Sequence, residues 1–238
     1  MAVAWAVALI AGAGAVALAQ FGWDHLSHAR PLEELSYYPS GRHLRPATLG
    51  HPEAAADLAW LRAVQYYGEH RQLDNHFVRM AHVFDIITTL APRFTASYVF
   101  GAFALAQEGR DFPAAEALME KGLEANPTNA ALAFQAGFLY YVKAGGRDLR
   151  HAAEYFELAA RLPDAPPQAA RFAAFARQNA GDLAVAYALW RDVAEHSQNA
   201  YLREMAQRNL EEIEDAVARR QPERVIRRLS TPQVRIGQ

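Results

Sequence analysis

Two histidines near the N-terminus have a spacing that could bind a metal. His25 and His28 lie three residues apart, which on a helix places both imidazoles on one face, beside Asp24. No third ligand is evident, so the alternative interpretation is a pair of polar residues at a membrane interface. The acidic run Glu211–Asp215 falls on an expected exposed helix face, which offers neither the cleft nor the separated pKa values of an acid–base pair.

No catalytic motif is present in the sequence. It lacks a G-x-S-x-G elbow, a phosphate-binding P-loop, a G-x-G-x-x-G loop and an H-E-x-x-H zinc motif. It also lacks cysteine, which excludes thiolate catalysis and cysteine-ligated metal centres. We therefore expect no enzyme activity, cofactor, bound metal or small-molecule substrate. The net charge of −2 argues against a nucleic-acid partner.

The C-terminal residues 221–238, with the two arginines before them, are expected to form a basic tail. Between positions 219 and 238 the one acidic residue is Glu223. Such a tail could contact anionic lipid headgroups, acidic protein or nucleic acid, and a solvated terminus is the alternative. Val225 and Ile226 could instead be ordered against a partner. The tail arginines are Arg219, Arg220, Arg224, Arg227 and Arg228.

The N-terminal residues 1–23 have the composition of a transmembrane signal anchor. Ala2 to Trp23 contain no charged side chain, and 22 helical residues would span about 33 Å. Trp5 and Trp23 lie near the two ends, where interfacial aromatics belong. Gly12 and Ala15 belong to a small-residue face that could pack on another membrane helix.

Two other interpretations of this segment stay open. One is a buried helix of the soluble domain, and the other is a cleaved signal peptide, because Ala17–Ala19 has an A-x-A pattern. We favour a retained, single-pass anchor in a bacterial inner membrane, with the following domain on the periplasmic side.

After the anchor, residues 24–52 are expected to be a proline-rich connector, and helical periodicity follows from Pro52 onward. Prolines end helices at Pro92, Pro127 and Pro163, at spacings of 35 and 36 residues. Aspartates are expected to begin the second helix of each pair, at Asp74, Asp111, Asp148 and Asp182. Small residues that would let paired helices approach recur at Gly68, Gly101, Gly137 and Ala174. Small or apolar residues, each followed four positions later by a large one, recur at Met80, Ala115, Ala152 and Ala186.

These units resemble the tetratricopeptide repeat, a helix–turn–helix of 34 residues, although none carries the complete signature. The segment Ala56–Gly68 is also similar to bacterial proteins of this family that have one N-terminal membrane segment. The resemblance implies an all-α fold, with an α-solenoid of about four helix pairs over residues 53–198 and a capping helix over 199–220. The four units are Leu61–Phe94, Thr95–Thr128, Asn129–Asp164 and Pro167–Gln198.

Proteins of this family bind partners in a concave groove lined by the first helices of the pairs. Family positions transferred to these units imply an aromatic groove flanked by arginines. The implied groove residues are Arg62, Gln65, Glu69, Tyr98, Phe134, Phe138, Tyr141, Arg171, Phe175 and Gln178. The alternative is that half of the aromatic residues face the core.

The function that these features predict is a membrane-anchored scaffold or adaptor that binds a protein partner, within a larger membrane assembly. One alternative is a permanent structural subunit of a membrane electron-transfer or photosynthetic complex, held mainly by its transmembrane helix. Another is an assembly factor for such a complex.

Overall fold

The structure is a computed structural model that describes residues 12, 14–20, 22 and 39–226. The chain divides into two compact units, Met1–Pro39 and Ser40–Gln238. In the first unit the described residues between positions 12 and 22 are helical, and Ala15 among them is exposed. No helix formed by the described residues combines the length and apolar character that a membrane crossing needs. Trp5, Trp23 and most of the expected anchor lie outside the described residues, as do His25 and His28.

The described part of the second unit contains helices joined by turns and loops and no β-strand, which confirms the all-α class. After a short connecting segment with α2 (Gly41–Leu44) and a 3₁₀ turn, η2 (Arg45–Thr48), one helix follows another. These are α3 (Pro52–Leu73), α4 (Met80–Leu90), α5 (Thr95–Gln107), α6 (Phe112–Ala125), α7 (Ala130–Tyr141), α8 (Leu149–Arg161), α9 (Ala169–Ala180), α10 (Leu183–His196), α11 (Ala200–Ala218) and α12 (Glu223–Ile226).

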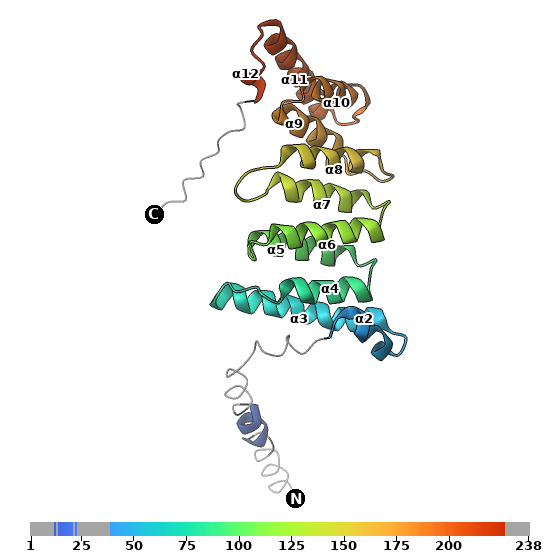
Figure 1. The fold of residues 1–238 in the computed structure, drawn as a ribbon, viewed down its shortest axis with the longest axis vertical. Coiled ribbons are helices and arrows are strands. Elements are labelled where there is room, and N and C mark those ends of the chain that lie inside the picture. The colour runs from blue at the N-terminus through green and yellow to red at the C-terminus, as the bar shows by residue number, and fades with distance from the viewer. Residues whose placement is uncertain (1–11, 13, 21, 23–38, 227–238) are drawn as a thin grey trace, which may run out of the picture. The chain divides into compact units, whose positions relative to one another are not determined.

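The helices of this unit follow one another in space in the order of the sequence (Figure 1). Each helix from α3 to α11 packs on its neighbours in the chain, and α5 also contacts α7. Contacts are therefore mostly local, as in proteins built by stacking small helical units. The 199–220 helix expected to close the stack is α11, which buries Ala206, Leu210, Ile213 and Ala216.

Aspartate and asparagine side chains begin several of these helices. Asp111 and Asp148 accept hydrogen bonds from the backbone N–H groups of Ala114 and His151, as N-caps do. The expectation for Asp74 is wrong, because α3 continues to Leu73 and Asp74 ends it; α4 begins only at Met80. Asp182 occupies an N-cap position, but its carboxylate accepts from Arg177 instead.

Two of the predicted close-approach glycines are confirmed and one is wrong. A Cβ atom at Gly101 would lie 2.6 Å from Cγ of Phe84, and one at Gly137 would lie 2.6 Å from Cδ1 of Phe156. Real Cβ atoms do not come that close to other atoms, so α5 and α7 can pack here only with glycine. Gly68 has nothing within 4 Å of its Cβ position and serves no such contact.

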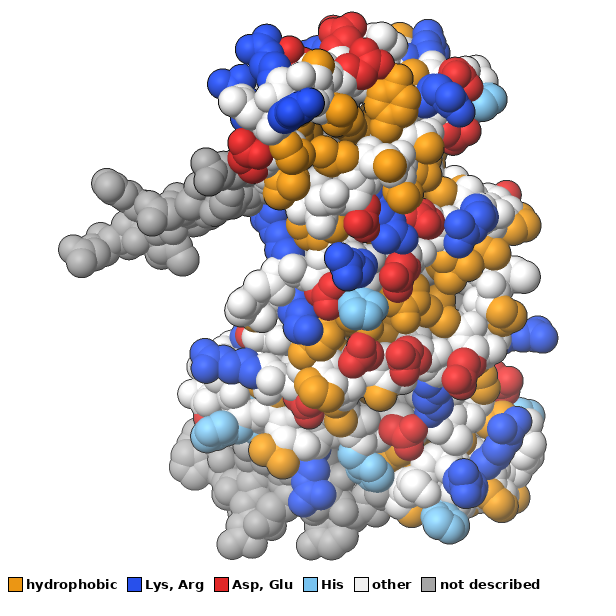
Figure 2. Space-filling model, turned by 45° about the horizontal axis from the view of Figure 1, so that its top comes forward, with side chains coloured by type: hydrophobic (Ala, Val, Ile, Leu, Met, Phe, Trp, Pro, Cys, Tyr) orange, Lys and Arg blue, Asp and Glu red, His pale blue; other side chains and the backbone are white. Residues whose placement is uncertain are grey.

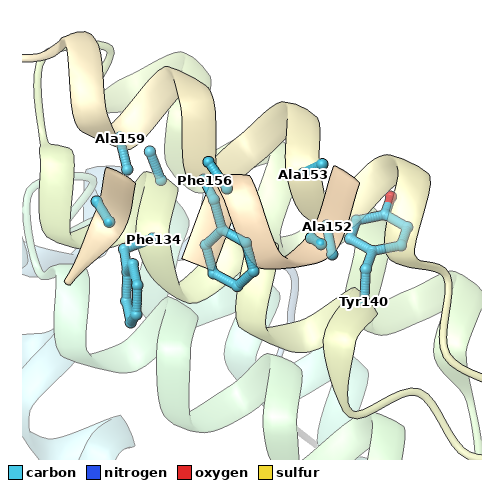
Figure 3. Packing of buried hydrophobic residues seen from close by; sticks show 10 residues of the cluster. Phe134, Tyr140, Ala152, Ala153, Phe156 and Ala159 are labelled. Atoms are coloured by element: carbon cyan, nitrogen blue, oxygen red, sulfur yellow. The ribbon is translucent and has the colours of Figure 1, made fainter. Parts of the chain in front are cut away.

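Alanine and aromatic side chains form the core between α7, α8 and α9. Figure 3 shows Phe134 of α7 and Phe156 of α8 in this core, together with alanines of α8. The centroids of these two rings are 5.1 Å apart, and Phe156 also meets Phe172 of α9 at 5.2 Å. Small alanines opposite large rings let the helices approach closely, which fixes where the outward-facing side chains of α7 and α9 lie.

The described parts of the expected connector and tail contain short helices that pack on the rest of the second unit. Gly41 of α2 is buried, and a Cβ there would lie 2.8 Å from Cβ of Thr89, so α2 packs tightly on α4. At the other end α12 contacts α9 and α11, and Val225 is buried in their core. Val225 therefore packs on its own chain, and the interpretation of it as a partner-bound segment is wrong.

Candidate partner-binding groove

A groove with a volume of about 660 Å³ lies between α3, α5 and α7. Its sides are polar and come from all three helices. Apolar side chains line the rest of it: Ala96, Val99, Phe100, Phe103 and Ala131. The polar residues at its sides are Tyr67, Gln107, Glu108, Asn129 and Gln135. A volume of this size accommodates several side chains of a bound segment.

Helix α5 supplies most of the groove because of the periodicity of its side chains. Ala96, Val99, Phe100 and Phe103 are spaced three, one and three residues apart, so they share one face of the helix. The opposite face carries buried residues such as Tyr98. The contact of Gly101 with Phe84 holds this second face against α4, and the first face is consequently left open.

A hydrogen-bonded ion pair fixes one side of the groove. The carboxylate of Glu108 pairs with Arg71 and accepts a hydrogen bond from the Tyr67 hydroxyl at 3.4 Å. Arg71 also donates to the Tyr67 oxygen at 2.8 Å. The hydrogen bond to Tyr67 and the charge of Glu108 raise the pKa of the Arg71 guanidinium. The negative charge of Glu108 is therefore compensated by Arg71 of the same chain.

Half-buried aromatic rings continue this surface from α5 across α7 to α9, and we call them the aromatic row. Phe103 lies 6.1 Å from Phe138, and Phe138 lies 6.4 Å from Phe172, between ring centroids. Tyr141 then meets Phe172 at 5.9 Å and Phe175 at 6.3 Å. The aromatic row comprises Phe100, Phe103, Phe138, Tyr141, Phe172 and Phe175.

Two arginines lie on rings of the aromatic row. The Cζ atom of Arg147, in the turn between α7 and α8, is 4.9 Å from the centroid of Tyr141. The Cζ atom of Arg171, on α9, is 4.7 Å from the centroid of Phe172. Both distances are within the range of cation–π attraction, which holds each guanidinium against its ring.

Four of the expected groove residues lie on this surface. Phe138, Tyr141 and Phe175 belong to the aromatic row, and Arg171 stacks on it. Phe100, Phe103 and Val99 were missed in the sequence. The available signal was their spacing on α5, which groups them on the face opposite the close-approach glycine Gly101.

Three other expected groove residues are buried, and their assignment is wrong. Tyr98 is fully buried and donates to the carbonyl oxygen of Pro92 at 3.2 Å; burial raises its pKa to about 12. Phe134 packs into the α7–α9 core. Gln178 is buried and accepts a hydrogen bond from Nε1 of Trp190 at 2.6 Å.

The α3 residues expected in the groove point elsewhere. Arg62, Gln65 and Glu69 are exposed, but α3 contributes Tyr67 to the groove. Two residues correspond to about 200° around a helix, so Gln65 and Tyr67 lie on nearly opposite faces. The expected rotation of α3 about its axis is therefore wrong by about half a turn.

The arginines of the expected basic tail are only partly described by the structure. Arg219 pairs with Asp215 at 2.7 Å on α11, and Arg224 lies in α12. Arg227 and Arg228 lie outside the described residues. Within the described ranges no group of three His, Asp or Glu side chains could hold a metal ion.

Comparisons of the chain with protein-family models, with curated proteins and with solved structures gave no match.

Proposed function

We propose that this chain is a membrane-anchored adaptor of the tetratricopeptide-repeat type, which binds a segment of a protein partner in the groove and along the aromatic row. The observation that carries the proposal is the continuity of this partly exposed aromatic surface across α5, α7 and α9. Such a surface loses contact with water when a segment covers it, which favours binding.

The repeat assignment is supported by packing that recurs between successive helix pairs. A Cβ atom at Gly101 of α5 would lie 2.8 Å from Leu118 of the following helix α6, and one at Gly137, 36 residues later in α7, would lie 2.6 Å from Phe156 of the following helix α8. Three second helices, α6, α8 and α10, each bury an alanine completely at intervals of 37 and 34 residues, namely Ala115, Ala152 and Ala186. A two-helix unit buries its apolar face only by stacking on its neighbours, which accounts for this recurrence.

The chemistry of the groove favours an apolar or mixed segment. Aromatic and arginine side chains supply most of the energy at protein interfaces, and both types lie together here. Gln107, Asn129 and Gln135 provide hydrogen bonds to a backbone that runs along the groove.

Membrane attachment through residues 1–23 belongs to this proposal and raises the local concentration of partner at the bilayer. The inner membrane with a periplasmic helical domain remains our prediction. If the chain is instead a structural subunit held by its membrane helix, Gly12→Leu with Ala15→Leu will abolish association with the complex. An adaptor that binds through its groove will retain its partner in this variant.

The groove itself can be tested by filling it. Ala131 is exposed within the groove, so Ala131→Arg adds bulk there without disturbing the core. Ala188→Arg, at an exposed position of α10, is the matched control. The full chain is purified in mild detergent, and co-purifying proteins are quantified by mass spectrometry. We expect a partner that the wild type and Ala188→Arg retain and that Ala131→Arg loses at least about tenfold. Equal recovery with both variants contradicts binding in the groove.

A further inference from the structure

Building on the proposed function, we propose that the bound segment carries an aspartate or glutamate side chain, whose carboxylate binds Arg147 and Arg171 beside the aromatic row. These two arginines define an acidic specificity for the partner at the α9 end of the row. The inference depends on how their charges are compensated in the protein.

Two other arginines near the core or the groove have a carboxylate partner. Arg71 pairs with Glu108, and Arg177 donates to Glu157 at 2.6 Å and to Asp182 at 3.2 Å. On the face shown in Figure 2, Lys and Arg side chains alternate with Asp and Glu, so that charges of both signs are close together. Pairing with a carboxylate is thus one arrangement of cations on this chain.

Arg147 and Arg171 differ from this arrangement. Among the residues that the structure describes, no carboxylate is paired with either guanidinium, and each contacts an aromatic ring instead. Arg171 is half-buried, and its Nε atom is buried without a hydrogen-bond acceptor. A partly desolvated cation without an acceptor gains strongly when an anion approaches its remaining N–H groups.

The rings place the two cations close to the path of the bound segment. Tyr141 and Phe172, which carry the arginines, form one edge-to-face pair with centroids 5.9 Å apart. Phe172 touches Phe138, and Phe138 touches Phe103 of the groove. Both guanidiniums therefore lie on rings that continue the groove surface toward α9.

The guanidinium group favours a carboxylate as ligand. Its planar N–H groups match the two oxygens of a carboxylate, and stacking on a ring fixes the plane in advance. The described residues that line the groove include no lysine or arginine. The aspartate or glutamate side chain of the bound segment is therefore expected at the end of the segment that lies on α9.

The experiment selects random 12-residue peptides, displayed as internal segments, on the full chain in mild detergent. We expect the wild type to enrich apolar residues together with Asp or Glu. The Arg147→Glu and Arg171→Glu double variant is expected to enrich Lys or Arg in their place. Arg208→Glu, at an exposed position of α11, is the matched control and will select the same acidic peptides as the wild type.

Binding of one selected acidic peptide is then measured by fluorescence anisotropy. Neutralising both arginines, as Arg147→Gln with Arg171→Gln, should weaken binding about tenfold or more, and the loss should shrink at high salt. Arg147→Glu alone provides a variant in which the half-buried Arg171 is untouched, and it too should weaken the acidic peptide.

Selection of apolar peptides without acidic enrichment overturns this inference and leaves the proposed groove function standing. The same acidic enrichment on the double charge-reversal variant also overturns it. If no peptide is enriched on the wild type, both this inference and the proposed function fail.

Discussion

Single positions on a helix decide whether a side chain in this protein packs in the core or faces a partner. Tyr98 is fully buried, whereas its neighbour Val99 lines the groove. One residue rotates the side chain by about 100°, so an error of one position exchanges a core residue for a binding residue. Gly68 and Gly137 show a similar contrast, because the two occupy comparable repeat positions but only Gly137 is in close contact.

Alanine substitutions at these two glycines should have opposite effects. Gly137→Ala places a methyl group against Phe156 and should destabilise the protein by about 1–3 kcal/mol, as overpacking does. Gly68→Ala adds a methyl group in open space within a helix and should stabilise it by about 0.5–1 kcal/mol. Urea unfolding monitored by circular dichroism measures both. Equal effects at the two sites would mean that the helices do not approach closely at Gly137.

The buried pair of Gln178 and Trp190 gives a second test. Gln178→Ala leaves the indole N–H without an acceptor, and this should cost about 1–3 kcal/mol of unfolding free energy before any cavity is counted. Gln207→Ala, at an exposed position of α11, should change stability by less than about 0.5 kcal/mol. Thermal and urea unfolding of the two variants provide the comparison, and matching stabilities would place Gln178 outside the core.

Capping side chains and the local backbone conformation determine where several helices in this chain begin and end. Asn129 and Asn199 cap α7 and α11 through their side chains, as Asp111 and Asp148 cap α6 and α8. Asp74 resembles these residues in sequence but ends α3, because the next residue, Asn75, turns into the left-handed region with φ 54°. The same residue type thus serves either end of a helix, depending on the backbone that follows.

Removing the cap of α8 should have an effect that depends on pH. Asp148→Ala should cost about 1 kcal/mol at pH 7. Burial opposes ionisation of Asp148, but hydrogen bonds from the ring and backbone of His151 outweigh it, and the folded-state pKa is below the ordinary value of 3.8. A depressed pKa stabilises the fold above 3.8, and this stabilisation is lost as the pH falls through the folded-state value.

The difference between wild type and Asp148→Ala should therefore persist at pH 5 and diminish only below pH 3.8. Urea unfolding over this range measures it, with Glu154→Ala on the exposed face of α8 as the control. A difference that disappears already between pH 7 and pH 5 would contradict the assigned hydrogen bonds.

The second unit as a whole is held together mainly by contacts between helices that are neighbours in the chain. In such a stack a local defect need not reach distant helices, because each described helix packs mainly on its neighbours in the chain. The core that includes Val225 involves α9, α10 and α11, whereas the groove depends on α3, α5 and α7.

Val225→Asp should therefore loosen one end of the stack only. It buries an unpaired charge, so amide hydrogen exchange measured by mass spectrometry should accelerate about tenfold or more in α9–α11 and stay unchanged in α3–α5. Val217→Asp, at an exposed position of α11, is the control and should change exchange in neither region. Acceleration throughout the unit would show that it unfolds as one cooperative block.

Helix content and several helix ends could be predicted from residue types and spacing, because caps, prolines and apolar periodicity act within one or two turns. The groove could not, and Gln65 and Tyr98 were assigned to it wrongly. The rotation of each helix about its axis depends on which side chains it buries against its neighbours, and contacts such as Gly101 with Phe84 decide that only in the folded chain. The aromatic row and its two unpaired arginines exist for the same reason, since α5, α7 and α9 are brought together only by stacking.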